Sequence, residues 1–149
     1  MKFHCDTGIF NLSSNLTLSP KMRKEEILAQ NVVWEEWFPI IDGVAFNYRT
    51  VIDLKGVNDN EKITVIINLN GTSLSNSSLK SWLCAPTHEF SGVQTKPEGK
   101  ITKNLRTWFK SKTSTSLPAN GNWGSIDAAY DPHNQTAEIV CIYTKNNNY

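Results

Sequence analysis

Several segments of the chain alternate apolar with polar residues, a pattern that predicts β-strands. Residues 10–18 hold two short alternations around Ser13-Ser14-Asn15, which predicts one short strand or two with a turn. Residues 44–54 predict a longer strand with every second side chain on one face. Residues 62–69 are apolar on both faces, as in a central strand covered on both sides.

The later strands follow recognisable turn signals. Asn70-Gly71, the strongest short hairpin signal, precedes a strand predicted over residues 79–85. Residues 123–130 and 136–144 predict a closing hairpin, because Asp131-Pro132-His133-Asn134 between them is rich in turn-forming residues. The strands therefore form a meander followed by a C-terminal hairpin.

Two segments predict helices. Ser19-Pro20 resembles a helix start, with a short helix expected over residues 21–30. Thr95 and Glu98 form a capping box at the start of a second helix that runs to about residue 112. That helix has one apolar stripe, made by Ile101, Leu105, Trp108 and Phe109. The aromatic segment 31–41, between the first helix and the strand over residues 44–54, is predicted to be an irregular, well-packed connection.

These elements predict an α+β fold, an antiparallel β-sheet (meander plus C-terminal hairpin) with two helices packed against it. The 149 residues suit one domain over residues 1–149, and a hydrophobic content of 39% with 19% charged residues argues against disorder. Cys5, Cys84 and Cys141 form neither a disulfide framework nor a CxxC pair, and the latter two are expected to be buried.

The chain lacks the signals of secretion and of membrane insertion. Its N-terminus has no apolar segment of a signal peptide, and no stretch approaches the ~18 apolar residues of a membrane span. A cytoplasmic location without membrane partners is expected. The net charge of +1 fits neither a strongly basic nucleic-acid binder nor a strongly acidic mimic of nucleic acid.

No catalytic motif is present, so the chain is predicted not to be an enzyme and to need no cofactor or metal. His4 lies in a predicted tail and His133 in a turn, while His88-Glu89 is a weak acid/base candidate. Asp131 is explained by the turn that it starts, whereas Asp127 stays open between a structural and a functional role.

Two charged segments are candidate binding surfaces. The predicted helix over residues 96–112 has a basic outer face that suits phosphates, although a solvated helix face is the simpler explanation. Its basic residues are Lys96, Lys100, Lys103, Arg106, Lys110 and Lys112. The other segment places acids around two tryptophans, as in a protein-binding hot spot, although the tryptophans also suit a core. Its residues are Glu25, Glu26, Trp34, Glu35, Glu36, Trp37 and Asp42.

Two stretches resemble a known class of proteins. One runs from Phe10-Asn11-Leu12 through Leu18-Ser19-Pro20 to Ile27, and resembles a strand that leads into a helix in many small bacterial proteins. The other, Trp123-Gly124 with Tyr130-Asp131-Pro132 and then 137–143, resembles the small immunity proteins of polymorphic toxin systems, including contact-dependent growth inhibition and type VI secretion. The two stretches cover less than half of the chain, and their motifs are structural.

The resemblance implies a cytoplasmic protein that binds one cognate toxin domain, often a nuclease, and blocks its active site or substrate surface. If that toxin is basic, the acidic segment 25–42 is the expected contact. Two alternatives stay open. One is a nucleic-acid-binding module that uses the basic helix, and the other is a small-ligand domain whose pocket is lined by Trp123, Asp127 and Tyr130.

Overall fold

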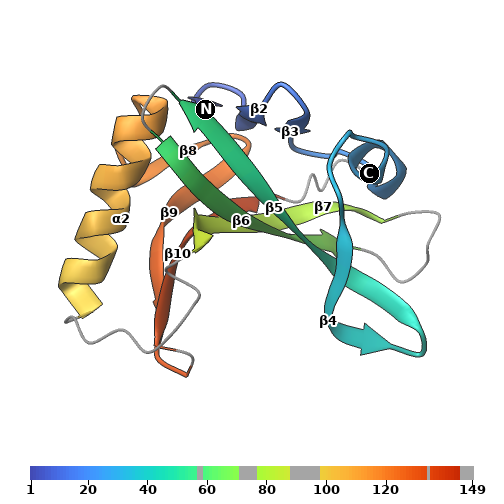
Figure 1. Cartoon of the computed structure of the whole chain (residues 1–149). Coiled ribbons are helices and arrows are strands. Elements are labelled where there is room, and N and C mark those ends of the chain that lie inside the picture. Colours follow the sequence, from blue (N-terminus) through green and yellow to red (C-terminus); the bar gives the residue numbers. More distant parts are fainter. Residues whose placement is uncertain (57–58, 71–76, 88–97, 134, 145–149) are drawn as a thin grey trace.

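Strands make up most of the described chain and form two antiparallel sheets (Figure 1). The computed structural model describes residues 1–56, 59–70, 77–87, 98–133 and 135–144. A small sheet has the order β1-β2-β3, and a seven-stranded sheet has the order β4-β5-β6-β7-β10-β9-β8. The bounds are β1 Lys2–His4, β2 Ile9–Ser13, β3 Leu16–Leu18, α1 Lys24–Leu28, β4 Glu35–Ile41, β5 Val44–Gly56, β6 Asp59–Asn70, β7 Ser78–Pro86, α2 Glu98–Thr113, β8 Ala119–Gly121, β9 Gly124–Asp131 and β10 Thr136–Tyr143.

The predicted α+β class, the meander and the closing hairpin are confirmed. β5, β6 and β7 pair in sequence order, and β9 pairs with β10. The hairpin joins the meander because β10 also pairs with β7, with Cys141 opposite Trp82. β6 is a central strand, as predicted, and residues 63–65 are buried although their side chains alternate between its two faces.

An aromatic cluster holds the layers together. Phe10 of β2 stacks on Trp82 of β7 with a centroid separation of 4.8 Å. The Phe3 ring of β1 meets four aromatic rings edge-on, including those of Phe109 in α2 and Trp123 before β9. In Figure 1 α2 lies beside β9 and β10, and the small sheet lies across one end of the large one. The small sheet and α2 therefore share one core with the large sheet.

Buried hydrogen bonds tie the two sheets together. The Trp82 indole N–H donates to the Tyr143 hydroxyl at 3.0 Å, and that hydroxyl donates to the Gly8 carbonyl at 2.7 Å. The Trp123 indole N–H donates to the Cys5 carbonyl at 2.7 Å. The turn between β1 and β2 is thus bonded to the large sheet through side chains that also pack in the core.

Cys84 and Cys141 are fully buried, which confirms their predicted role as small hydrophobic residues. Burial raises the pKa of the Cys141 thiol to about 12, and raises that of Cys84 as well. Neither helix in the described part of the chain has the length and apolar character that a bilayer crossing needs.

The first predicted helix is too long. α1 begins only at Lys24, because Lys21 has a positive φ of 66° and Arg23 is extended. The Arg23 backbone N–H donates to the Glu26 carboxylate, so the helix is capped at Arg23 and not at the predicted start, Ser19-Pro20. Ile27 of this helix is fully buried.

Three other predictions are corrected. His4 lies in β1 rather than in a tail, and its ring is 3.0 Å from the Asn11 side chain. Segment 31–41 is not an irregular connection, because residues 35–41 form β4. Residues 113–122, whose Ser, Thr, Pro and Gly content predicts a loop, contain the short strand β8. The capping-box residue Thr95, the turn at Gly71 and His88 lie outside the described residues.

The second helix is confirmed where the structure describes it. In α2, Ile101, Leu105 and Phe109 are buried, and Trp108 is partly buried against the core. The Trp108 indole N–H donates to the Glu61 carboxylate at 2.6 Å, and the Lys112 ammonium lies 2.7 Å from the other oxygen of that carboxylate. Glu61 of β6 therefore holds the C-terminal half of α2.

Candidate functional site

β4 and β5 form a tight hairpin at one edge of the large sheet. Ile41 pairs with Val44, so the loop consists of Asp42 and Gly43 alone. Both loop residues have positive φ, 51° and 75°, as the favoured two-residue hairpin turns require. This hairpin carries four residues of the predicted acidic segment, because Glu35, Glu36 and Trp37 lie on β4 and Asp42 lies in the loop that follows it.

Apolar side chains project from this edge into solvent. Phe38 is 74% exposed and Ile40 49% exposed on β4, and Val33 before the strand is 87% exposed. Among the strands that the structure describes, β4 pairs with β5 alone and lies at the end of the strand order. Large apolar side chains grouped on an outer strand, with charged residues around them, are typical of a protein-binding surface.

Arg49 of β5 organises the charged side chains next to these apolar ones. Its guanidinium forms an ion pair with Glu35 and lies 4.9 Å from the ring centroid of Trp37. The cation over the ring holds the half-buried Trp37 side chain against the sheet. Glu36 and Asp42 are exposed. The hairpin therefore presents a rigid aromatic ring with carboxylates at its margin.

The remaining residues of the predicted acidic segment are placed apart from the hairpin. Glu25 and Glu26 are exposed on α1, where Glu25 lies 3.7 Å from Arg23 and Glu26 caps the helix. Trp34 is half-buried against the core, and its indole N–H donates to the Ile27 carbonyl at 3.2 Å. Trp34 therefore holds the segment that leads into β4 against the core and does not project into solvent.

We use the name β4 surface for the residues that the hairpin and its approach expose together. These are Val33, Glu35, Glu36, Trp37, Phe38, Ile40 and Asp42. The acidic residues among them were found from the sequence. The exposed apolar residues were missed, although Asp42-Gly43 is a strong hairpin signal that identifies a strand on either side.

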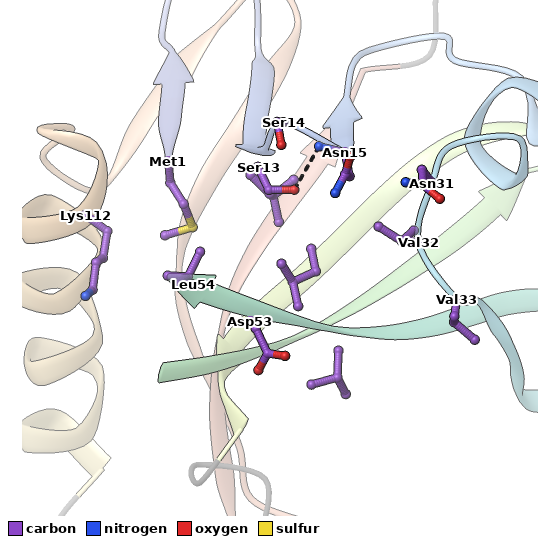
Figure 2. Close-up of a pocket in the computed structure, with 13 residues that line it drawn as sticks. Met1, Ser13, Ser14, Asn15, Asn31, Val32, Val33, Asp53, Leu54 and Lys112 are labelled. Atoms are coloured by element: carbon purple, nitrogen blue, oxygen red, sulfur yellow. Dashed lines mark hydrogen bonds between the residues drawn. The ribbon is translucent and has the colours of Figure 1, made fainter. Parts of the chain in front are cut away.

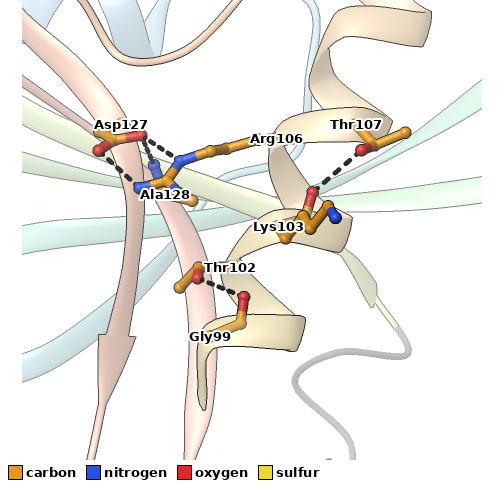
Figure 3. A network of polar contacts seen from close by, with 7 residues as sticks. All are labelled: Gly99, Thr102, Lys103, Arg106, Thr107, Asp127 and Ala128. Atoms are coloured by element: carbon orange, nitrogen blue, oxygen red, sulfur yellow. Dashed lines mark hydrogen bonds and ion pairs between the residues drawn. The ribbon is translucent and has the colours of Figure 1, made fainter. Parts of the chain in front are cut away.

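Asp127 has a structural role. The Arg106 guanidinium of α2 donates to both Asp127 carboxylate oxygens of β9, at 2.9 and 3.0 Å, and Figure 3 shows the two side chains facing one another. The Ala128 backbone N–H donates to the same carboxylate. These bonds, above all the one from Arg106, lower the pKa of Asp127. The pair joins α2 to β9.

Replacing Asp127 with asparagine is expected to lower the free energy of unfolding at neutral pH by less than about 1 kcal/mol, because the ion pair is partly solvated. A lowered folded-state pKa adds stability above the unfolded pKa, and this stability is lost as pH falls through the folded value. Urea unfolding of both proteins at about pH 7 and about pH 3 measures this. An equal difference at the two pH values would contradict it.

The structure supports the two alternative sites, the basic helix face and the small-ligand pocket, less well than the β4 surface. Of the predicted basic face, Arg106 and Lys112 are engaged by Asp127 and Glu61, and Lys96 lies outside the described residues. Trp123 lines a hollow of about 500 Å³, but Asp127 and Tyr130 are not among its lining residues. The predicted small-ligand pocket is therefore not assembled. No cluster of metal-binding side chains occurs in the residues that the structure describes.

A larger hollow of about 750 Å³ lies next to the β4 surface (Figure 2). Residues 51–54 of β5 line one side, and residues 13–15 and 31–33 line others. Val33 belongs both to this hollow and to the β4 surface. The two features therefore form one continuous stretch of the molecular surface.

Comparison with known proteins decides the family. The model of the RhsI1 immunity protein family matches residues 1–148. The chain belongs to this family. This immunity protein is also similar to a chain of the solved structure "Rhs1-CT in complex with cognate immunity protein RhsI1", with 41% identity over 96% of this chain and 86% of that one, and a TM-score of 0.83. No curated protein matches it.

The family membership confirms the prediction of an immunity protein that acts by binding and is not an enzyme. The resemblance that the sequence carried in residues 123–143 was therefore correct at the level of the class. The comparisons do not test the predicted contact residues Glu25, Glu26, Trp34, Glu35, Glu36, Trp37 and Asp42, which stay a prediction.

Proposed function

We propose that this immunity protein neutralises the C-terminal toxin domain of a cognate Rhs protein, and that the β4 surface is its main contact. The partner follows from the complex named for the similar structure, in which an immunity protein accompanies Rhs1-CT. The choice of surface rests on one observation. Phe38, Ile40 and Val33 are large apolar side chains exposed beside the carboxylates of Glu35, Glu36 and Asp42.

The apolar and aromatic side chains would supply affinity in this arrangement. Interfaces draw most of their binding energy from a few central residues, often aromatic, that become fully desolvated. Phe38 and Trp37 have this character, and their rings lie 5.6 Å apart between centroids. Because Trp37 is already held by Arg49, little conformational entropy is lost when a partner covers it.

The carboxylates would govern the rate of association with the toxin and the choice of partner. A rim of charges of one sign attracts an oppositely charged surface and speeds the encounter of the two proteins. The toxin face that meets Glu35, Glu36 and Asp42 is therefore expected to be basic. A rigid hairpin placed over that face would block access of substrate without any chemical step by the immunity protein.

Reversing two charges in Glu35→Lys/Glu36→Lys is expected to weaken toxin binding by about 10- to 100-fold, since each rim charge contributes roughly 1 kcal/mol and a tenfold change corresponds to about 1.4 kcal/mol. Titration calorimetry at low and high salt measures the loss, which should shrink as salt rises. The single variants Asp6→Lys and Glu36→Lys form a matched pair with the same change of charge. Asp6 is exposed like Glu36, but it lies beside Trp123 and not on the β4 surface.

An affinity that stays unchanged in the double variant would remove the β4 surface as the contact. A loss of the same size in Asp6→Lys would assign the effect to net charge alone. Glu25→Lys/Glu26→Lys has the same total charge change as the β4 pair and reports whether the contact extends onto α1. We include Glu25 and Glu26 in the proposed contact as its margin, with Trp34 as a support beneath it.

We further propose that residues 1–149 act as a single domain in the cytoplasm, against a toxin delivered by contact-dependent growth inhibition or by type VI secretion. The core includes residues of both sheets and of α2, which supports a single unit. All three cysteines are free, and Cys5 is exposed, which suits a reducing compartment. The delivery route rests on the resemblance in residues 123–143.

A further inference from the structure

β5 extends well beyond the strand that covers its outer edge. β4 begins at Glu35, opposite Arg49, whereas β5 stays paired with β6 as far as Gly56. From Thr50 onward no strand of the described chain pairs with β5 on its outer side. Successive residues of an antiparallel strand direct their backbone groups to opposite neighbours. Every second residue from Thr50 to Leu54 therefore points its backbone N–H and C=O away from β6.

This open edge borders the hollow of about 750 Å³. Figure 2 shows the hollow between β5, the turn at residues 13–15 and the segment 31–33, with Met1 and Lys112 at one end. The turn and the segment stand apart from β5 and form the opposite wall of a groove that follows the strand. A groove along an unpaired strand edge has the shape of one further strand.

The side chains in the groove suit an extended chain. Apolar side chains of Leu12, Val32 and Leu54 line it, and Val51 remains 42% exposed. Ser13, Ser14 and Asn15 supply polar groups on the opposite wall. Strand addition derives affinity from backbone hydrogen bonds and specificity from contacts to alternate side chains. An edge of this kind that stays open also invites pairing with another chain.

We propose that an extended segment of the cognate toxin domain enters this groove and adds a strand to the open edge of β5 at residues 50–54. The inference rests on the proposed function and deepens it, since Val33 makes the groove continuous with the β4 surface. The segment would carry apolar side chains at alternate positions, facing Val51 and Val33. Asp53 is exposed at the same edge and favours a basic residue in that segment.

Amide hydrogen exchange, resolved by residue in the free immunity protein and in its complex with the Rhs toxin domain, tests the proposal. Alternate amides among residues 50–54 are expected to exchange at least about tenfold more slowly in the complex, because newly formed strand hydrogen bonds protect them. The amides that already bond to β6 should change much less. Unchanged exchange at residues 50–54 in a complex that still forms would overturn the proposal.

A pair of matched variants provides a second measurement. Val51→Lys places a charge at the groove and is expected to weaken toxin binding at least about tenfold. Ile142→Lys is the control, because Ile142 is a similarly exposed strand residue, at 52% against 42%, on β10 at a distance in the strand order. Circular dichroism checks that both variants fold. Equal affinities of the two variants would contradict strand addition.

The outcomes distinguish failure of strand addition from failure of the proposed function, which is binding of an Rhs toxin domain. If the wild-type protein binds no Rhs toxin domain, both proposals fail. If it binds, and Glu35→Lys/Glu36→Lys weakens the complex while residues 50–54 gain no protection, only strand addition fails. Protection of these amides in the free protein that grows with its concentration would assign the edge to a second copy of this chain and overturn the proposal.

Discussion

Replacing Trp82 with alanine is expected to lower the free energy of unfolding by about 3–5 kcal/mol, the usual cost of removing a large buried aromatic side chain. Trp82 is 1% exposed and stacks on Phe10. Its ring lies between the two sheets, so its removal would leave a cavity with the small sheet on one side and the large sheet on the other. The substitution also removes the donor to the Tyr143 hydroxyl.

Urea unfolding followed by circular dichroism measures this loss. Trp37→Ala is the control, since Trp37 is half-buried on the β4 surface and its cation–π contact contributes only about 0.5–1 kcal/mol. Trp37→Ala should instead weaken toxin binding. Equal losses of stability in the two variants would show that the core is not organised around Trp82.

A milder variant keeps the test informative if Trp82→Ala does not fold. Tyr143→Phe removes only the hydroxyl that accepts from Trp82 and donates to Gly8. Each buried polar group left without a partner costs about 1–3 kcal/mol. Two such groups, the Trp82 indole N–H and the Gly8 carbonyl, lose their partner here, so a loss of at least about 2 kcal/mol is expected. A neutral result would mean that these hydrogen bonds do not join the two sheets.

Replacing Gly124 with alanine is expected to cost about 3 kcal/mol or more. Gly124 has a φ of 139°, a conformation that costs other residues roughly 1–3 kcal/mol. A Cβ atom there would lie 2.0 Å from the Ile142 carbonyl oxygen, which is backbone and not free to rotate away. β9 and β10 would have to separate where Gly124 pairs with Tyr143, and overpacking of this kind adds about 1–3 kcal/mol.

Gly99→Ala is the matched control for this substitution. Gly99 lies near the start of α2, and nothing lies within 4 Å of the Cβ that alanine would add. Alanine favours a helix over glycine by up to about 1 kcal/mol, so this variant should be as stable as the wild type or more stable. Thermal unfolding of both variants gives the comparison. A stable Gly124→Ala protein would contradict the close approach of β9 and β10.

The candidate site was found in part from the sequence, and its missing part has a clear cause. The acids of segment 25–42 stand out as charges, and exposure of charged side chains is the rule. Phe38 and Ile40 are apolar, so the same rule places them in the core. Their exposure is decided by the position of β4 at the end of the strand order, with β5 as its partner.

Asp127 illustrates the same division. In the sequence it is an isolated carboxylate on a predicted strand, and a functional role was as reasonable as a structural one. Its partner Arg106 is 21 residues away, on a helix whose position is set by burial of Ile101, Leu105 and Phe109. Only after α2 packs beside β9 does the guanidinium reach the carboxylate.

The fold class, the meander, the closing hairpin and α2 could be predicted from the sequence alone, because hydrophobic periodicity and turn residues are local signals. The sequence also carried the resemblance to immunity proteins in residues 123–143. Three features became visible in the folded chain: residues 35–41 form an edge strand, no described strand covers the outer side of β5 beyond Arg49, and the small sheet packs on the large one. These features depend on which distant strands pair and where each pairing stops, and no local pattern of residues specifies either.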